Sequence, residues 1–310
     1  MDDLYSAEVV EGIAHESVSQ GQKLFIWQKP KVLDSPSCGT ILFVHGSSMA
    51  SQPTFDLQVK GKPYASAMNW FASRGFDTWC FDCRGYGRSY KGNDVLATIS
   101  DGADDALAAA EYIADQGTEG PLLIYGISSG ALRAALFSQR NPDRVARVAL
   151  DAMVWTGKGS PTLEQRRTKL DQWRGTTRRP QNAEFMWSIF NRDHPGTVHD
   201  DFAQPFIDQV LELDDSMPNG TYIDMCANLP LVDPAKLAMP VAILRGEYDG
   251  IASMEDLLDF FALLPNADKE FAVMPGISHA SFAQKNFMIT YQILHAFYTR
   301  PKQLYRVGDH

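Results

Sequence analysis

The sequence predicts an α/β fold with a mainly parallel, eight-stranded sheet that carries helices on both faces. Two observations predict the sheet: short apolar runs typical of buried strands alternate with segments of helical periodicity, and this alternation occurs in two separate blocks. Between the blocks the alternation stops. We therefore expect a core formed by residues 1–154 and 235–310, with residues 155–234 inserted as a helical cap.

The first block contains six expected strands. Residues 9–18 and 23–28 are typical of an antiparallel pair, and residues 40–44 form the continuous apolar run of a buried parallel strand. A short amphipathic helix is expected to end before Gly75. Residues 99–116 have apolar side chains at helical spacing, and several aspartates lie near the N-terminal end of this segment, where the helix dipole favours anions. The expected order is strands 9–18, 23–28 and 40–44, helix 65–73, strand 76–81, helix 99–116, strand 122–125, helix 131–139 and strand 145–150.

The second half of the chain contains the expected insertion. Helical segments at 162–173, 183–190 and 202–213 are separated by Gly and Pro, with no strand pattern between them. Alternation then resumes with strand 241–244, helix 254–264, strand 271–274 and the closing helix 282–298. Both ends of the insertion would meet the carboxyl edge of the sheet, where open α/β folds bind their ligands.

Composition excludes several classes of protein. Hydrophobic residues make up 45% of the 310 residues and charged residues 21%, which is typical of a globular chain and not of a disordered or collagen-like one. The net charge of −10 predicts a surface that repels phosphate groups, so we expect neither a nucleic-acid partner nor an anionic membrane. The sequence shows no transmembrane run and no secretory signal, so a cytoplasmic protein is expected.

The four cysteines do not indicate a disulfide framework. Cys80 and Cys83 form a CxxC motif, but it follows a strand into a turn, whereas a redox CxxC opens a helix. No second pair of ligands accompanies it, so we interpret the two thiols as incidental and expect a reducing compartment.

Residues 126–130 (GISSG) form the strongest motif, because they follow an expected strand and precede an expected helix. Glycines two residues on either side of a serine permit a tight strand-to-helix turn that raises the hydroxyl of Ser128 above the sheet. Ser128 is therefore the predicted nucleophile. The alternatives are Ser129 as nucleophile, or a turn with two ordinary surface serines.

A serine hydroxyl needs a base and the base needs an orienting acid. His279 lies in the loop after the last expected strand, at the same edge of the sheet as Ser128. Asp249 follows strand 241–244 and emerges at that edge too, with Glu247 close by. Asp151, just past strand 145–150, is a second candidate for the acid, but we favour Asp249.

The glycine-containing run 45–48 (HGSS) follows the strand 40–44. Such a loop can turn a backbone N–H toward the carbonyl oxygen of a substrate. We expect the N–H groups of Ser47 and Ser129 to form an oxyanion hole, in which one donor contributes about 3 kcal/mol to the transition state. His45 is expected to brace this loop.

These motifs together resemble the α/β-hydrolase superfamily. HGSS at 45–48, DCRGYGRS at 82–89, GISSG at 126–130, GEYD at 246–249 and the loop 276–279 occur in the family's order. The resemblance implies Ser128 as nucleophile, His279 as base and Asp249 as orienting acid, without a metal or organic cofactor. It also implies a structural role for Asp82 and the turn at 84–87. A serine at the elbow argues against dehalogenases and epoxide hydrolases, which carry aspartate there.

The expected cap is rich in aromatic and basic residues. We predict that Trp155, Trp187 and Phe190 line an apolar pocket; the alternative is that they form the core of the cap itself. An arginine of the basic stretch could bind a substrate carboxylate, or the stretch could be a solvated face paired with nearby acids. The stretch comprises Lys158, Arg166, Arg167, Lys169, Arg174, Arg178 and Arg179.

The predicted activity is hydrolysis of a carboxylic ester through an acyl-enzyme, with a small molecule as the substrate. The same three groups would also serve a hydrolase of carbon–carbon bonds in β-diketones or dienoic acids, an amidase or a lactonase. A binding protein that has kept only the fold is a further alternative. The sequence determines neither the substrate nor the oligomeric state.

Overall fold

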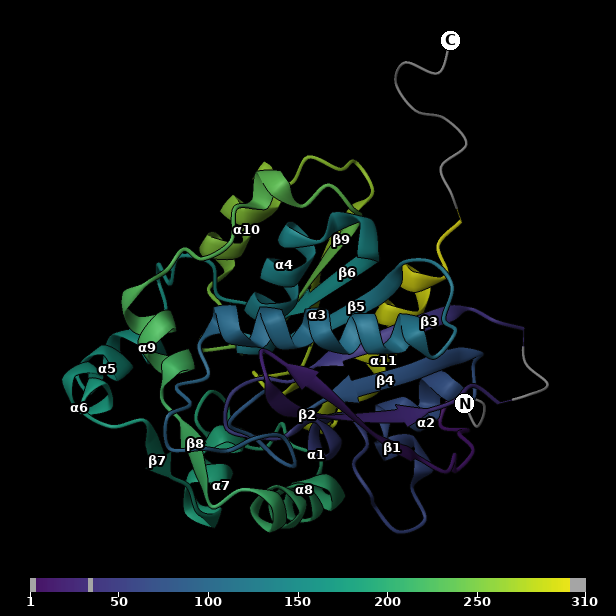
Figure 1. Cartoon of the computed structure of the whole chain (residues 1–310). Coiled ribbons are helices and arrows are strands. Elements are labelled where there is room, and N and C mark those ends of the chain that lie inside the picture. Colours follow the sequence, from purple (N-terminus) through teal and green to yellow (C-terminus); the bar gives the residue numbers. More distant parts are fainter. Residues whose placement is uncertain (1–3, 33–35, 302–310) are drawn as a thin grey trace.

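A computed structural model describes residues 4–32 and 36–301. Residues 1–3, 33–35 and 302–310, which fall in the predicted core, lie outside the described residues. A single sheet of eight strands runs through the molecule, and helices cover both of its faces (Figure 1). The predicted fold class is therefore confirmed.

The sheet has the strand order β1-β2-β4-β3-β5-β6-β9-β10. β1 pairs antiparallel with β2, and β2 antiparallel with β4, whereas the other neighbours pair in parallel. The parallel strands thus all bring their carboxyl ends to one edge. The strands are β1 (Ile13–Ser19), β2 (Gln22–Lys29), β3 (Gly39–Val44), β4 (Phe76–Phe81), β5 (Leu122–Ile127), β6 (Val145–Asp151), β9 (Val241–Gly246) and β10 (Lys269–Met274).

Two hydrophobic layers flank the sheet, because successive side chains of a strand point to opposite faces. In β3, Leu42 and Val44 pack in one layer with α3, while Ile41 and Phe43 pack in the other with α11. Figure 1 shows α3 in front of the sheet and α11 behind it. The helices around the sheet are α1 (Ser51–Phe55), α2 (Ala67–Ala72), α3 (Ile99–Asp115), α4 (Ser129–Arg140), α10 (Met254–Leu263) and α11 (Phe287–Tyr298), with 3₁₀ turns at Pro63–Ala65, Pro142–Arg144, Pro234–Lys236 and Ser281–Ala283.

The chain between β6 and β9 is mostly helical, and it lies to the left of the sheet and below it in Figure 1. The single helix expected at 162–173 is wrong, because two short helices occupy this range. A small antiparallel sheet of β7 and β8 was not predicted, since three-residue strands leave no periodic pattern. The elements are α5 (Pro161–Arg167), α6 (Leu170–Arg174), β7 (Arg178–Pro180), α7 (Ala183–Asn191), α8 (Asp200–Leu213), β8 (Ser216–Pro218) and α9 (Gly220–Ala227).

Hydrogen bonds anchor this segment to the sheet layers at two places. The N–H of Gly220 donates to Leu96 O, and the guanidinium of the buried Arg133 on α4 donates to Thr221 Oγ1 and to His45 O. Farther along, the N–H of His199 donates to Ala283 O. The inserted segment is thereby fixed against the carboxyl edge of the sheet.

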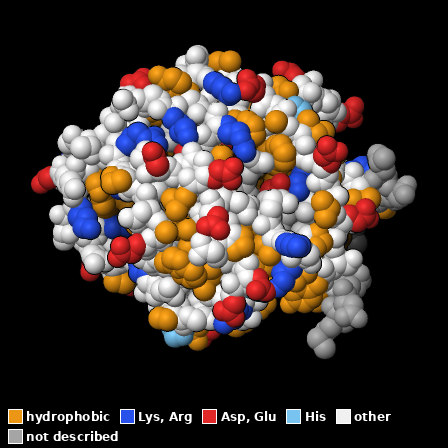
Figure 2. Space-filling model, turned by 90° about the horizontal axis from the view of Figure 1, so that it is seen from below, with side chains coloured by type: hydrophobic (Ala, Val, Ile, Leu, Met, Phe, Trp, Pro, Cys, Tyr) orange, Lys and Arg blue, Asp and Glu red, His pale blue; other side chains and the backbone are white. Residues whose placement is uncertain are grey.

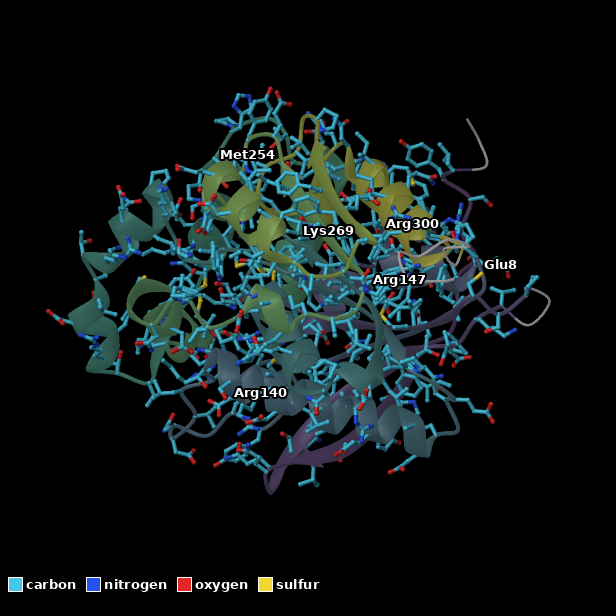
Figure 3. The ribbon with its side chains drawn as sticks, turned by 90° about the horizontal axis from the view of Figure 1, so that it is seen from above. Glu8, Arg140, Arg147, Met254, Lys269 and Arg300 are labelled. Carbon is cyan, nitrogen blue, oxygen red and sulfur yellow. The ribbon has the colours of Figure 1, made fainter. Side chains whose placement is uncertain are left out.

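The opposite end of the sheet is held by ion pairs. Arg147 on β6 and Arg300 after α11, which lie close together in Figure 3, both contact Asp268, at 2.7 and 2.9 Å. On the face shown in Figure 2, acidic and basic side chains are interspersed. Within the described residues, none of the helices combines the length and apolar character needed to cross a bilayer.

Candidate active site

Ser128 occupies a strained turn between β5 and α4. Its backbone has φ 57° and ψ −124°, a region that residues with side chains rarely adopt, and its N–H donates to Asp151 O at 2.8 Å. Strain of this kind persists only where the surrounding structure enforces it. Here it places the serine above the carboxyl end of β5, at the start of the helix.

The two glycines of the motif allow the turn to form. A Cβ on Gly126 would lie 2.4 Å from Gly130 O, and a Cβ on Gly130 would lie 2.2 Å from Val44 O. Both distances are too short for any side chain, and the atoms that would be struck belong to the backbone. The spacing of the motif therefore reflects close contact of β5, α4 and β3.

Three side chains form a continuous line of hydrogen bonds at this edge. The imidazole Nε2 of His279 lies 2.8 Å from Ser128 Oγ. Its Nδ1 lies 2.9 Å from Oδ2 and 3.0 Å from Oδ1 of Asp249. The histidine and aspartate are buried, with 7% and 5% of their surfaces exposed. The arrangement can pass a proton from the hydroxyl to the imidazole while the carboxylate balances the resulting charge.

Asp249 is held in its ionised form. Burial alone would raise its pKa, but the charge and hydrogen bond of His279 and the N–H groups of Ala252 and Ile251 outweigh burial, and the pKa lies below its ordinary value. The two N–H groups donate to Oδ1 at 2.9 and 2.8 Å. The carboxylate is thus fixed in the orientation that receives the imidazole N–H.

Asp151, the second candidate for the orienting acid, faces another partner. Its Oδ2 accepts the hydroxyl hydrogen of Tyr125 at 2.6 Å, and burial raises its pKa to about 7. Glu247 braces the histidine loop instead, since its carboxylate accepts the N–H of Gly276 at 2.8 Å. Of the acids considered, it is Asp249 that hydrogen-bonds His279.

The loop after β3 runs beside the serine. A Cβ on Gly46 would lie 3.1 Å from Ile127 O and 3.9 Å from Ser128 Oγ. Ser47 follows in the chain and lines the same cavity as Ser128. Ser129 is the first residue of α4, where the first N–H groups of a helix have no partner within the helix. Of the two residues predicted to form the oxyanion hole, Ser47 therefore lines the same cavity as Ser128 and Ser129 follows it at the start of α4.

His45 braces this loop as a neutral side chain. Its Nδ1–H donates to Gly46 O at 2.7 Å and its Nε2 accepts the N–H of Cys83 at 2.9 Å. Burial and the nearby charge of Arg133 lower its pKa to about 3. A second ring proton would point at the Cys83 N–H, so the neutral form fits both contacts.

The residues implied to be structural and the CxxC cysteines also lie in this region. Asp82 accepts the N–H and hydroxyl hydrogens of Ser51 at 2.8 and 2.6 Å, and the N–H of Arg88 at 2.9 Å, which ties the turn after β4 to α1. Arg84 forms a buried ion pair with Asp105 at 2.7 Å. Burial raises the pKa of Cys83 to about 12, so its thiol is not activated as a nucleophile.

A cavity of about 770 Å³, its open mouth included, opens above the serine. Core residues and the inserted segment both line it, and Phe190 is among them. Trp155 and Trp187 are not, which corrects the expectation for these two. The indole N–H of Trp155 donates to Val232 O and its ring packs on Phe260, whereas Trp187 stays 37% exposed.

Three further residues line the cavity that the sequence did not assign to it: Arg166, Arg192 and Tyr222. Arg166 was part of the basic stretch, but nothing in its spacing separated it from its neighbours. Arg192 directly follows α7 as its C-cap, and its guanidinium donates to both carboxylate oxygens of Asp193 at 2.7 and 3.0 Å. Ligand atoms of Asp193, Asp249 and His279 lie within 4.8 Å of one another, but each already has a partner within the protein.

Comparisons with known proteins agree with this architecture. The sequence model of the family described as serine aminopeptidase, S33, matches residues 36–194. The search of curated protein sequences found no match.

Solved structures share the fold at low sequence identity. The chain superposes on an E-2-(acetamidomethylene)succinate hydrolase with a TM-score of 0.67 and 18% identity, covering 93% of this chain and 99% of that one. A carboxylesterase from Bacillus subtilis gives 0.66 and 16% (95% and 93%), and an enol-lactonase from Burkholderia xenovorans gives 0.65 and 15% (92% and 100%). The chain therefore belongs to the serine aminopeptidase S33 family of the α/β-hydrolase superfamily, and it is a hydrolase.

Proposed function

We propose that this hydrolase cleaves a carboxylic ester through a covalent acyl-enzyme, with Ser128 as nucleophile, His279 as base and Asp249 as orienting acid. The observation that carries the proposal is the line of hydrogen bonds from Ser128 Oγ through both nitrogens of His279 to Asp249. The strained elbow that presents Ser128 supports it further, because backbone strain concentrates at functional sites.

The reaction would proceed in two steps. Ser128 Oγ attacks the ester carbonyl while His279 Nε2 takes the hydroxyl proton, and the N–H groups of Ser47 and Ser129 stabilise the oxyanion. Collapse of the tetrahedral intermediate breaks the bond to the alcohol, which leaves with the proton from His279. Water, activated by the same imidazole, then attacks the acyl-enzyme and releases the acid, and Ser128 recovers its proton.

Residues 155–234 act in this proposal as a cap that completes the substrate cavity. Arg166, Phe190 and Tyr222 from this segment line the cavity together with Ser128. The substrate would be a small molecule, since the cavity is a concave, largely apolar site with a few polar groups around Ser128 and His279. The four cysteines are unpaired, which supports a reducing compartment such as the cytoplasm.

The activities of proteins with similar structures support an ester as the substrate, and amides and β-diketones are the alternatives. A carboxylesterase and an enol-lactonase both cleave ester bonds, whereas the family name refers to an aminopeptidase. A panel of matched ester, amide and β-diketone substrates distinguishes these activities. We expect the ester to give the highest kcat/KM.

A fluorophosphonate probe tests the nucleophile, because it reacts covalently with activated serine hydroxyls. We expect labelling of the unmodified protein and none of Ser128→Ala. Ser129→Ala is the matched control: its hydroxyl is buried and has no hydrogen-bond partner in the described chain, so this variant should still label. Labelling of Ser128→Ala would refute the assignment, and so would loss of labelling only in Ser129→Ala.

A further inference from the structure

One end of the cavity above Ser128 is lined by positively charged groups of the inserted segment. Arg166 on α5 and Arg192 at the end of α7 line the cavity, and Tyr222 on α9 lies with them. Behind Tyr222 the guanidinium carbon of Arg179 lies 3.6 Å from the ring centroid, and that of Arg166 lies 4.3 Å from it. Arg166, Arg179 and Arg192 are called the arginine cluster below.

The positive charge of the arginine cluster is only partly balanced. Among the described residues, the carboxylate paired with the cluster is that of Asp193, which holds Arg192. Arg179 Nη1 donates to Pro218 O and Asn219 Oδ1, but its buried Nη2 has no hydrogen-bond partner in the described chain. Among the described residues, the guanidinium of Arg192 is thus paired with a carboxylate, whereas those of Arg166 and Arg179 are not.

Arg166 is the member that is free to meet a ligand. In the described part of the chain it forms no ion pair and no hydrogen bond, and its contact is the face of the Tyr222 ring. It is half-buried and lines the cavity that contains Ser128 and His279. Partial burial of a guanidinium without an acid is costly, and a carboxylate or another anion would reduce that cost.

Electrostatic effects on neighbouring groups agree with a positive potential here. Burial alone would raise the pKa of Tyr222, yet Arg166 and Arg179 lower it to about 7, helped by the Ser48 hydroxyl and Arg192. Burial and repulsion from Arg192 and Arg179 hold the pKa of Arg166 below its ordinary value. The cluster thus stabilises negative charge at this end of the cavity.

Four other members of the basic stretch, Lys158, Arg167, Arg174 and Arg178, have partners elsewhere. Lys158 pairs with Glu255 at 2.6 Å and Arg174 with Asp171 at 3.7 Å, all of them exposed. The Arg167 guanidinium donates to Cys226 O, and that of Arg178 to Gly85 O. The description as a solvated face fits Lys158 and Arg174, but it does not fit Arg166.

We propose that Arg166, supported by Arg179 and Arg192, binds a carboxylate carried by the substrate, so that the preferred substrate is a monoester of a dicarboxylic acid. This inference rests on the proposed ester hydrolysis. Arg192 is paired with Asp193, whereas Arg166 lines the cavity without a paired carboxylate, so an anionic group of the substrate would find its partner at Arg166. Leu57, Phe190 and Phe206, which line the rest of the cavity, would receive the methylene groups and the alcohol.

Two esters of equal size test the proposal. Ethyl hydrogen glutarate carries the carboxylate, and its neutral counterpart replaces that group with a methyl ketone. We expect the unmodified protein to hydrolyse the anionic ester with the higher kcat/KM in a pH-stat assay. In Arg166→Met, the ratio of the two kcat/KM values should fall about 10- to 100-fold, the range of a charge-assisted hydrogen bond. Arg166→Lys keeps the positive charge but loses the planar guanidinium that can donate two parallel hydrogen bonds to a carboxylate, so it should give an intermediate ratio.

Arg174→Met is the matched control, since it removes one positive charge from the same segment outside the cavity. Its ratio should stay within about twofold of the unmodified protein, because an exposed charge is screened. Equal kcat/KM values for the two esters in the unmodified protein would overturn the inference while leaving ester hydrolysis intact. An equal loss of preference in Arg166→Met and Arg174→Met would overturn it too.

Calorimetric titration with glutarate separates this inference from the proposed reaction, because binding needs no turnover. If neither ester is hydrolysed, the proposed function fails. Glutarate binding at least tenfold weaker in Arg166→Met than in the unmodified protein would still support the carboxylate site. Absence of glutarate binding to the unmodified protein would count against the site itself.

Discussion

Replacing Asp249 by asparagine should reverse the proton arrangement of His279. Oδ1 of Asp249 accepts the N–H groups of Ile251 and Ala252, so the amide oxygen of the asparagine would take this position. The amide NH₂ would then occupy the Oδ2 position, 2.9 Å from His279 Nδ1. Because an NH₂ group donates, Nδ1 would have to accept, and the ring proton would move to Nε2, which faces Ser128 Oγ.

The size of the effect follows from two contacts. Restoring the productive tautomer would place two donors against each other, which costs about 1–3 kcal/mol, and the imidazolium would lose a charge-assisted hydrogen bond of about 1.5–3 kcal/mol. The sum of about 2.5–6 kcal/mol corresponds to a fall in kcat of about 10²- to 10⁴-fold. Asparagine fills the same space, so the thermal unfolding midpoint should change little.

Steady-state hydrolysis of an activated ester, with Asp151→Asn as the matched control, measures this effect. Asp151 is a buried carboxylate of the same region, but its side chain accepts a hydrogen bond from Tyr125 and none from His279. We expect Asp151→Asn to keep kcat within about tenfold. The reasoning is refuted if Asp249→Asn retains most of its activity, or if both variants lose activity equally.

Two further predictions concern His45 and the cavity wall. The unfolded chain protonates His45 near pH 6.5, whereas the folded protein keeps it neutral down to about pH 3, so acid favours unfolding. As the pH falls from 7 to 5, the free energy of unfolding should therefore decrease by about 2 kcal/mol because of His45. In urea denaturation, the free energy of unfolding of His45→Gln should depend less on pH than that of the unmodified protein, and an unchanged dependence would contradict this. Phe190→Ala should raise KM for esters with a bulky apolar group. Trp187→Ala removes an exposed ring outside the cavity lining and should leave KM unchanged. Equal changes in KM for the two variants across a series of esters would contradict the cavity assignment.

Local pattern alone determined much of the architecture. Residues 40–44 read as a buried strand because both of their faces are covered, and β3 lies between β4 and β5 in the structure. The predicted helix 99–116 corresponds to α3, whose start is capped by Thr98 and Asp101. The elbow at 126–130 could be predicted because its glycines are close in sequence and follow a strand pattern, although only the contact of Gly126 with Gly130 O lies within the strand–turn–helix unit and Gly130 packs against Val44 of β3.

The sequence by itself determined which side chains stand at the carboxyl ends of strands, since that depends on periodicity within a few residues. Only the tertiary structure decided that His279 contacts Asp249 while Asp151 contacts Tyr125, because both acids lie at the carboxyl ends of neighbouring strands and their partners come from distant parts of the chain. It also decided that Arg166 lines the cavity while Arg174, on the next helix, faces solvent. Which arginine faces the cavity depends on how α5 packs against α9. These two helices lie far apart in the chain, so no local pattern predicts their contact.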